Sequence, residues 1–194
     1  MGDWAVSIAD PVARFERELT AVGGLFHRAP PETLGDVFGA VLDGRSGARV
    51  LVARENGVPA EVDEAIAAAG GEVVRWPDAG TAAAAEADVG VTSALWAVAE
   101  TGSIVVSSAL PGGRAPSLLP PVHVAFVPVE RLVATTRSLF SRMAALEPRP
   151  SATVIVTGPS KSADIGMELT LGVHGPGEVH VVLLGRKLEP SGAS

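Results

Sequence analysis

The residues best placed to do chemistry lie in one segment, which reads VIVTGPSKSADIGMELTLGVHGP from Val154 to Pro176. It begins as a buried strand and passes through Gly158 and Pro159 into a predicted helix that runs to residue 171. A strand, a glycine turn and a helix N-terminus together present free backbone N–H groups and the positive end of the helix dipole. This combination is typical of a site for a phosphate or a carboxylate.

Side chains in the same turn add to this predicted anion site. Ser160 and Ser162 supply hydroxyl donors, and Lys161 supplies a cation at the rim. The turn matches neither the GxxxxGK[ST] nor the GxGxxG phosphate-binding pattern. A simpler interpretation stays equally open, in which Ser160 or Ser162 caps the helix and Asp164 favours its first turn.

Two further features of the segment could bind a ligand. Asp164 and Glu168 are four residues apart, so on a helix they share one face and could hold a metal or act as acid and base. A solvated helix face explains the same spacing. Gly172 and Gly175 bracket His174, which would turn the chain tightly and expose the imidazole to a ligand. An ordinary connection between two elements is the alternative for this histidine.

A second stretch, TSALWAVAETGS from Thr92 to Ser103, also ends in a glycine turn. Glu100 falls at the boundary between two elements, where a carboxylate can be held close to a ligand, and it is the candidate catalytic residue. Thr101 and Ser103 supply hydroxyl groups, and Gly102 permits a close approach to the backbone.

We therefore predict that two turns, Ala99–Ser103 and Thr157–Asp164, face a small anionic ligand. An alternative for Glu100 is an ion pair with a nearby arginine such as Arg114, which would order the segment 108–120. That segment is rich in Pro, Gly and Ser, and it is predicted to be a long loop of the kind that often forms a lid.

The elements that must position these turns alternate between helices and strands. Hydrophobic spacing predicts helices over residues 8–22, 31–42, 59–69, 81–87, 93–99 and 130–146. Apolar runs rich in β-branched residues predict strands over residues 48–53, 72–75, 88–92, 102–107, 122–127, 152–156 and 179–184. This alternation predicts an α/β fold with a largely parallel sheet and helices on both faces, and ligands in such folds bind at the carboxyl ends of strands.

The other three histidines carry weaker signals. His123 and His180 lie inside strand patterns, where a histidine of the core or of a sheet edge is expected, and His27 is predicted to lie in an N-terminal loop. The sequence holds no HExxH motif, metal-ligand cluster or GxSxG elbow, so it predicts neither a metal site nor a cofactor.

Composition narrows the class of protein. The 194 residues suggest one domain, and 47% hydrophobic with 19% charged residues indicates a globular chain. A net charge of −7 without a basic block argues against binding to nucleic acids or anionic membranes.

Without cysteine, this chain ligates no iron–sulfur cluster. It shows neither a signal peptide nor a membrane-spanning run, which predicts a cytoplasmic protein, and its composition is typical of a GC-rich bacterial genome.

Three stretches of the chain resemble a known family. They are IVTGPSKSADIGMELTLGVHGPGEVHVVLL, VTSALWAVAETGSIVVSS and PPVHVAFVPVERLV, and the resemblance extends over about residues 48–185. They resemble the LUD-domain family, in the lactate utilization protein C group. One departure is Lys161-Ser162, where the family pattern has Arg-Thr. Lysine keeps the charge but lacks the bidentate fork of arginine.

The resemblance implies a fold like that of the glucosamine-6-phosphate isomerase, ribose-5-phosphate isomerase and CoA-transferase group. This fold is a three-layer α/β/α sandwich with a largely parallel sheet. We expect residues 1–194 to form a single LUD-type domain, with a helical N-terminal segment at 1–45 and an α/β core at 48–185. Some proteins of this fold use a glutamate beside a glycine as nucleophile, which invites comparison with Glu100 by analogy only.

The resemblance also implies a function. The chain would be a non-redox subunit of a system that oxidises L-lactate to pyruvate, together with partner subunits that carry iron–sulfur clusters. The absence of cysteine fits such a subunit. Two alternatives stay open at this stage: a stand-alone enzyme acting on a phosphosugar, CoA ester or folate-like substrate, and a regulatory or scaffolding module. In the first two cases the ligand is a small carboxylate or phosphate.

Overall fold

The computed structural model describes residues 10–53, 57–108, 113–148, 150–163, 169–171 and 174–185. The helices in these ranges are α1 (Pro11–Ala21), α2 (Leu34–Val41), α3 (Val62–Ala68), α4 (Gly80–Ala85), α5 (Ala115–Leu118) and α6 (Thr136–Ala144), with short 3₁₀ turns η1 (Pro31–Thr33) and η2 (Val129–Arg131). The strands are β1 (Leu25–Arg28), β2 (Arg49–Ala53), β3 (Glu72–Trp76), β4 (Val89–Ser93), β5 (Trp96–Val98), β6 (Ser103–Ser107), β7 (Val122–Pro128), β8 (Leu132–Val133), β9 (Thr153–Val156), β10 (Lys161–Ala163), β11 (Leu169–Leu171) and β12 (Glu178–Leu184).

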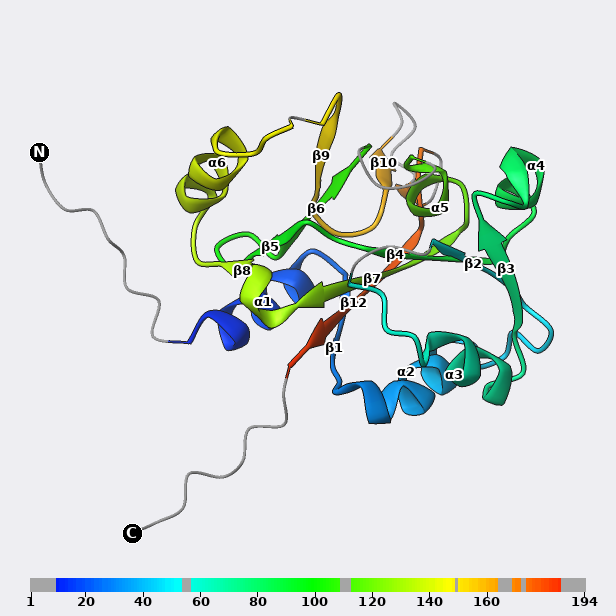
Figure 1. The fold of residues 1–194 in the computed structure, drawn as a ribbon. Helices are drawn as coiled ribbons and strands as arrows, with labels where there is room; N and C mark the ends of the chain where they lie inside the picture. The colour runs from blue at the N-terminus through cyan, green and yellow to red at the C-terminus, as the bar shows by residue number, and fades with distance from the viewer. Residues whose placement is uncertain are drawn as a thin grey trace, which may run out of the picture.

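A six-stranded sheet in the order β1-β12-β7-β4-β2-β3 forms the centre of the molecule (Figure 1). Its neighbouring strands all pair in parallel. Both faces of a parallel sheet are covered, so its strands are apolar almost throughout. The sequence RVLVA of β2 has this character, and four of its five residues are buried. The predicted α/β fold with a parallel sheet, a three-layer α/β/α sandwich, is confirmed.

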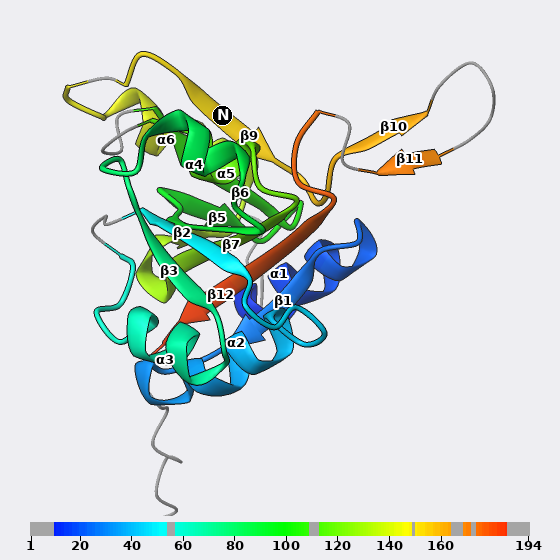
Figure 2. The same cartoon turned by 90° about the vertical axis from the view of Figure 1, so that its right-hand side faces the viewer.

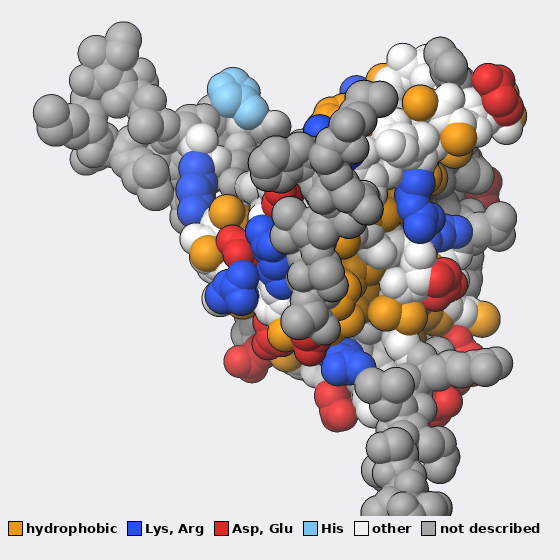
Figure 3. All heavy atoms as spheres, turned by 90° about the vertical axis from the view of Figure 1, so that its left-hand side faces the viewer, with side chains coloured by type: hydrophobic (Ala, Val, Ile, Leu, Met, Phe, Trp, Pro, Cys, Tyr) orange, Lys and Arg blue, Asp and Glu red, His pale blue; other side chains and the backbone are white. Residues whose placement is uncertain are grey.

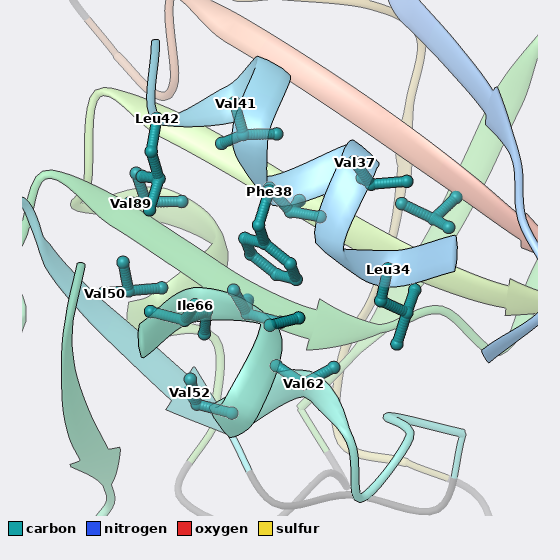
Figure 4. Close-up of a cluster of buried hydrophobic side chains, with 14 of the residues drawn as sticks. Leu34, Val37, Phe38, Val41, Leu42, Val50, Val52, Val62, Ile66 and Val89 are labelled. Atoms are coloured by element: carbon teal, nitrogen blue, oxygen red, sulfur yellow. The ribbon is translucent and has the colours of Figure 1, made fainter. Parts of the chain in front are cut away.

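Helices α2 and α3 cover one face of the parallel sheet. Phe38 and Val41 of α2 and Ile66 of α3 are fully buried against Val50 and Val52 of β2 (Figure 4). These side chains recur at three- and four-residue spacing on the helices and at two-residue spacing on the strand. The two periods direct all of these side chains into the interface between the helices and the sheet.

The opposite face of the parallel sheet packs against α1 and a second sheet in the order β8-β5-β6-β9 (Figure 2). Phe15 and Leu19 of α1, Ile104 of β6 and Val181 of β12 are buried together there. Asp10 caps α1, because its carboxylate accepts hydrogen bonds from the N–H groups of residues 12 and 13 at 3.0 and 3.1 Å.

On the outside of the molecule, acidic and basic side chains are intermixed over the face seen in Figure 3. In the part of the chain that the structure describes, no helix is both long and apolar enough to cross a membrane.

The structure corrects the predicted helix at 93–99. Trp96–Val98 is instead the strand β5, which pairs antiparallel with β6. Trp96 and Val98 are buried beside Val133 and Leu139. An apolar run this short has no clear period, so the pairing partner and not the local pattern decided its conformation.

Two predicted boundaries also differ. The amphipathic stretch 130–146 divides into η2, β8 and a shorter helix α6, which starts after Thr135 because the Thr135 hydroxyl accepts a hydrogen bond from Ser138 N at 3.2 Å. The N-terminal segment, predicted to be helical, also contains β1, which forms the edge of the parallel sheet.

The largest difference follows Thr157. The sequence predicts a helix there up to residue 171, but Lys161–Ala163 and Leu169–Leu171 form an antiparallel pair of strands (Figure 2). Residues 164–168 lie outside the described ranges. The strand at Leu169–Leu171 contradicts the predicted helix over those residues, and Lys161–Ala163 does not begin a helix.

Candidate functional site

The two glycine turns of the sequence analysis lie together in the structure. Strands β6 and β9 pair antiparallel, with Ile104 opposite Val156. This register brings the Ser103 hydroxyl to 2.8 Å from the Thr157 hydroxyl, and the Thr101 hydroxyl lies 2.7 Å from that of Ser103. A chain of three hydroxyl groups therefore joins the turns.

The glycines of both turns contact the backbone of α1. Gly102 has φ +65°, and a Cβ atom on it would lie 2.2 Å from Leu19 N. Gly158 has φ +76°, and its Cβ atom would lie 2.7 Å from Val22 O. The close approach predicted for Gly102 is thus made by a helix of the same chain.

Lys161 is also directed to α1. Its Nζ donates a hydrogen bond to Val22 O at 2.9 Å, at the C-terminal end of the helix. A cation there complements the negative end of the helix dipole and donates to one of the carbonyl groups at the helix terminus. Pro159 lies beside Lys161 against Gly23. The side chain of Ser162, in β10, is not described, and Asp164 and Glu168 lie outside the described ranges.

Glu100 contacts the start of α6. Its Oε2 accepts hydrogen bonds from Thr136 N at 2.8 Å and from the Thr136 hydroxyl at 2.9 Å. These two bonds, the backbone bond foremost, and the charge of Arg14 hold the pKa of Glu100 below its usual range. Glu100 therefore serves as an anionic cap at a helix N-terminus. Arg114, the alternative partner considered for Glu100, precedes α5.

Replacing Glu100 by alanine is expected to lower the free energy of unfolding by about 1 kcal/mol, the usual value of a helix cap. A carboxylate with a lowered pKa contributes this stability above its unfolded pKa and loses it as the pH falls through its folded pKa. Urea unfolding at neutral and at acid pH measures both effects, with Glu64→Ala on the exposed face of α3 as the control. If Glu100→Ala leaves the free energy of unfolding unchanged but abolishes growth on L-lactate, Glu100 would instead be a catalytic residue.

A pocket of about 230 Å³ brings the other predicted residues together. We call it the β9 pocket. It is lined by Ser117, Leu118, His123, Val154, Ile155, Val156, Gly158, Ser160, His174, Gly175, Pro176 and Val179. Gly158, Ser160, His174 and Gly175 are thus four sequence-predicted residues that share one cavity. A hydrogen bond from Ser160 N to Pro176 O at 2.8 Å joins the two segments that carry them.

His123 is a pocket residue that sequence reasoning missed. It is only 1% exposed, and its Nε2 lies 2.9 Å from the Thr92 hydroxyl on the neighbouring strand. Burial, and secondarily the charge of His180, lowers the pKa of His123 to about 4, so the ring is neutral near neutral pH. The partner is 31 residues away in the chain, and no local pattern marks it.

The segment 108–120, predicted to be a loop, instead contains the short helix α5, and this helix contributes a wall of the pocket. Helix α5 lies directly on β4, because a Cβ atom on Gly90 would be 1.8 Å from Pro116 O. Ser117 and Leu118 of this helix line the pocket, and the Ser117 hydroxyl donates to Arg114 O at 2.9 Å. Only a glycine on β4 leaves room for this contact.

The β9 pocket lies at the amino ends of two strands, so the prediction that the ligand site lies at the carboxyl ends of strands is wrong for this pocket. His123 and Val179 are each the second residue of their strand, β7 and β12. The chain from β9 onward runs back to this edge before it enters β12, and it carries Ser160 and His174 there.

The chemistry of the pocket follows from its lining. Valine side chains form much of the wall, and the polar groups are two serine hydroxyls, two imidazoles and the backbone of two glycines. Small-molecule sites commonly combine apolar walls with a few convergent polar groups. Within the described ranges, no group of three or more His, Cys, Asp or Glu side chains could hold a metal ion.

Fold and pocket define an α/β/α protein that presents a small, partly apolar cavity with a neutral buried histidine. The chain belongs to the LUD domain family, whose family model matches residues 12–184. It is similar to a "Lactate utilization protein C" of an Exiguobacterium species, with 37% identity over 164 residues, 78% of this chain and 67% of the relative.

Two other similarities agree with this family. A "Lactate utilization protein C" of Halalkalibacterium halodurans is 43% identical over 97 residues, 48% of this chain but 42% of the relative, so the match spans less than half of that protein. The crystal structure of a DUF162 family protein from Deinococcus radiodurans has a TM-score of 0.68 and 24% identity, and the likeness covers 93% of this chain and 99% of the other. The structural likeness supports the fold alone.

Proposed function

We propose that this chain is a cytoplasmic, non-redox subunit of a bacterial L-lactate utilization system. The observation that carries the proposal is the 37% identity over 164 residues to a protein named for lactate utilization. The chain has no cysteine, so the electrons of lactate oxidation would pass to partner subunits that hold iron–sulfur clusters.

We further propose that the β9 pocket binds the small carboxylate of this system. L-lactate carries a methyl group, a hydroxyl group and a carboxylate. The valine wall would take the methyl group, while the Ser160 hydroxyl and the backbone N–H groups near Gly158 and Gly175 would take the oxygens. Neutral His123 would accept or donate one hydrogen bond without adding a buried charge.

Growth on L-lactate tests the role in the cell. Deletion of the gene is expected to abolish growth on L-lactate but not on glucose, and the wild-type gene restores it. The double variant Ser160→Ala/His174→Ala should not restore growth, whereas the control Ser141→Ala, on the exposed face of α6, should. Normal growth after deletion would refute the proposal, and restoration by the double variant would favour a scaffolding role.

Ligand binding is tested with the purified chain. L-lactate should raise the free energy of unfolding by about 1.4 kcal/mol at ten times its Kd, because it binds only the folded state. The double variant should lose this stabilisation. Stabilisation by sugar phosphates or CoA instead of lactate would favour a stand-alone enzyme of the glucosamine-6-phosphate isomerase and CoA-transferase type.

A further inference from the structure

Four polar side chains form a continuous chain of contacts across the α2 side of the parallel sheet. Arg45 Nη2 lies 2.7 Å from Glu178 Oε2, and Glu178 Oε1 lies 2.6 Å from His180 Nε2. His180 Nδ1 lies in turn 2.8 Å from His27 Nε2, and the two rings are stacked. Glu178 and His180 lie in the first three residues of β12, and His27 lies in the neighbouring strand β1. We call it the Arg45–His27 relay.

The partners at one end of this relay determine the proton on every ring. Arginine only donates hydrogen bonds, and an ionised carboxylate only accepts them. Burial opposes the charge of Glu178, but its bonds to His180 and Arg45 keep its pKa below the ordinary value. His180 must therefore carry its proton on Nε2 and accept on Nδ1. His27 consequently carries its proton on Nε2, and its Nδ1 is left with a lone pair.

His27 stands at a second pocket. This β1 pocket, of about 470 Å³, lies where β1 passes into η1 and α2. It is lined by Phe26, His27, Arg28, Ala29, Pro30, Thr33, Asp36 and Val37. Burial, followed by the charge of His180, lowers the pKa of His27 to about 4, so a neutral imidazole faces this cavity near neutral pH. Among the described residues, the only side-chain hydrogen bond of His27 is the one to His180.

We propose that the β1 pocket is a second ligand site, in which His27 Nδ1 accepts a hydrogen bond from the hydroxyl of a small hydroxy acid whose carboxylate pairs with Arg28. Because Nδ1 carries a lone pair and no proton, it can accept a hydrogen bond, and it therefore favours a ligand with a hydroxyl group. Asp36 also lines the pocket, and its negative charge disfavours anions that offer no hydrogen-bond donor. His180 and Glu178 are positioning residues, because they act on the ligand only through His27.

In the relay, Glu178→Gln is expected to change the tautomers of both His180 and His27. A glutamine has one accepting oxygen, and Arg45 requires it because arginine cannot accept. The amide NH₂ then faces His180 Nε2, which must give up its proton and carry it on Nδ1. His27 Nε2 must then accept, so its proton moves to Nδ1, and the nitrogen left for the ligand changes from acceptor to donor.

Long-range ¹H–¹⁵N spectra of the full chain with ¹⁵N-labelled histidine rings test both parts. The wild-type protein should show His27 and His180 with the proton on Nε2, and Glu178→Gln should move both protons to Nδ1. The control Glu86→Gln also changes a carboxylate paired with an arginine, Arg49 at 2.6 Å, but lies outside the relay and should leave both rings unchanged. A wild-type His27 protonated on Nδ1, or unmoved protons in Glu178→Gln, would overturn the proposal.

The ligand is tested in the same spectra with glycolate and with acetate, which lacks the hydroxyl. Millimolar glycolate should shift the His27 Nδ1 resonance in a saturable way, and acetate should not. The shift should persist in Glu86→Gln and vanish in Glu178→Gln and in Arg28→Gln. Equal shifts with both acids, or no shift with either, would refute a hydroxy-acid site. Resonances of His123 and His174 report the β9 pocket separately.

Discussion

Replacement of Gly102 by alanine is expected to destabilise the protein by about 3 kcal/mol or more, at or above the upper end of the usual range for single substitutions. The new Cβ atom would lie 2.2 Å from Leu19 N and 2.6 Å from Leu19 Cα, both in the backbone of α1. A helix backbone cannot move aside as a flexible side chain can. The positive φ of +65° adds the ordinary strain of a residue other than glycine.

The matched control is Gly44→Ala. Gly44 has a similar φ of +71°, but nothing lies within 4 Å of its added Cβ atom. It should cost only about 1 kcal/mol, the contribution of the backbone conformation alone. Guanidinium unfolding of the two variants without ligand measures the difference. Equal losses would mean that α1 does not hold Gly102 in this contact, and the glycine would again be a candidate for ligand approach.

Acidification is expected to weaken the fold through His123. Its pKa is lowered from 6.5 to about 4 in the folded state, so the unfolded state binds more protons between these values. Stability is therefore complete above the unfolded pKa and falls as the pH drops toward the folded pKa. The buried ring alone should remove about 2 kcal/mol between about pH 7.5 and about pH 5, and about 3 kcal/mol in full.

Unfolding of His123→Gln at the two pH values isolates this contribution. The variant is expected to be less stable at neutral pH, because the packed ring is lost, but to lose about 2 kcal/mol less than the wild type on acidification. His27 and His180, whose pKa values are also lowered, weaken both proteins alike. The control Ser141→Ala changes an exposed side chain that does not titrate in this pH range, and it should keep the wild-type dependence of stability on pH. If the free energy of unfolding of His123→Gln falls with pH as much as that of the wild type, the ring of His123 takes up its proton without destabilising the fold.

Much of the fold follows from local pattern. The apolar runs at 48–53, 88–92, 122–127 and 179–184 are strands of the parallel sheet, because burial on both faces leaves a continuous apolar signal. Prediction was wrong where a short segment takes its conformation from a distant partner. The run 93–99 contains a strand because β6 pairs with it, and Lys161–Ala163 is a strand because Leu169–Leu171 pairs with it.

For the candidate site too, the sequence predicted some features and not others. Glycine, serine and histidine near a strand end indicated a ligand rim, and Gly158, Ser160, His174 and Gly175 do share a pocket. Residue types alone do not distinguish a contact with a ligand from a contact within the chain. Lys161 has the charge of an anion-binding residue, but its ammonium bonds to a helix carbonyl, Val22 O.

By itself, the sequence determined the class of fold, the absence of thiol chemistry and the two glycine turns, because these depend on composition and local periodicity. Tertiary structure alone decided what each turn approaches and which histidines meet. His27 and His180 are 153 residues apart and touch because β1 joins the sheet beside β12. Gly102 accommodates a helix backbone because α1 packs on its turn. Such contacts arise only when distant segments pack, so no local pattern encodes them.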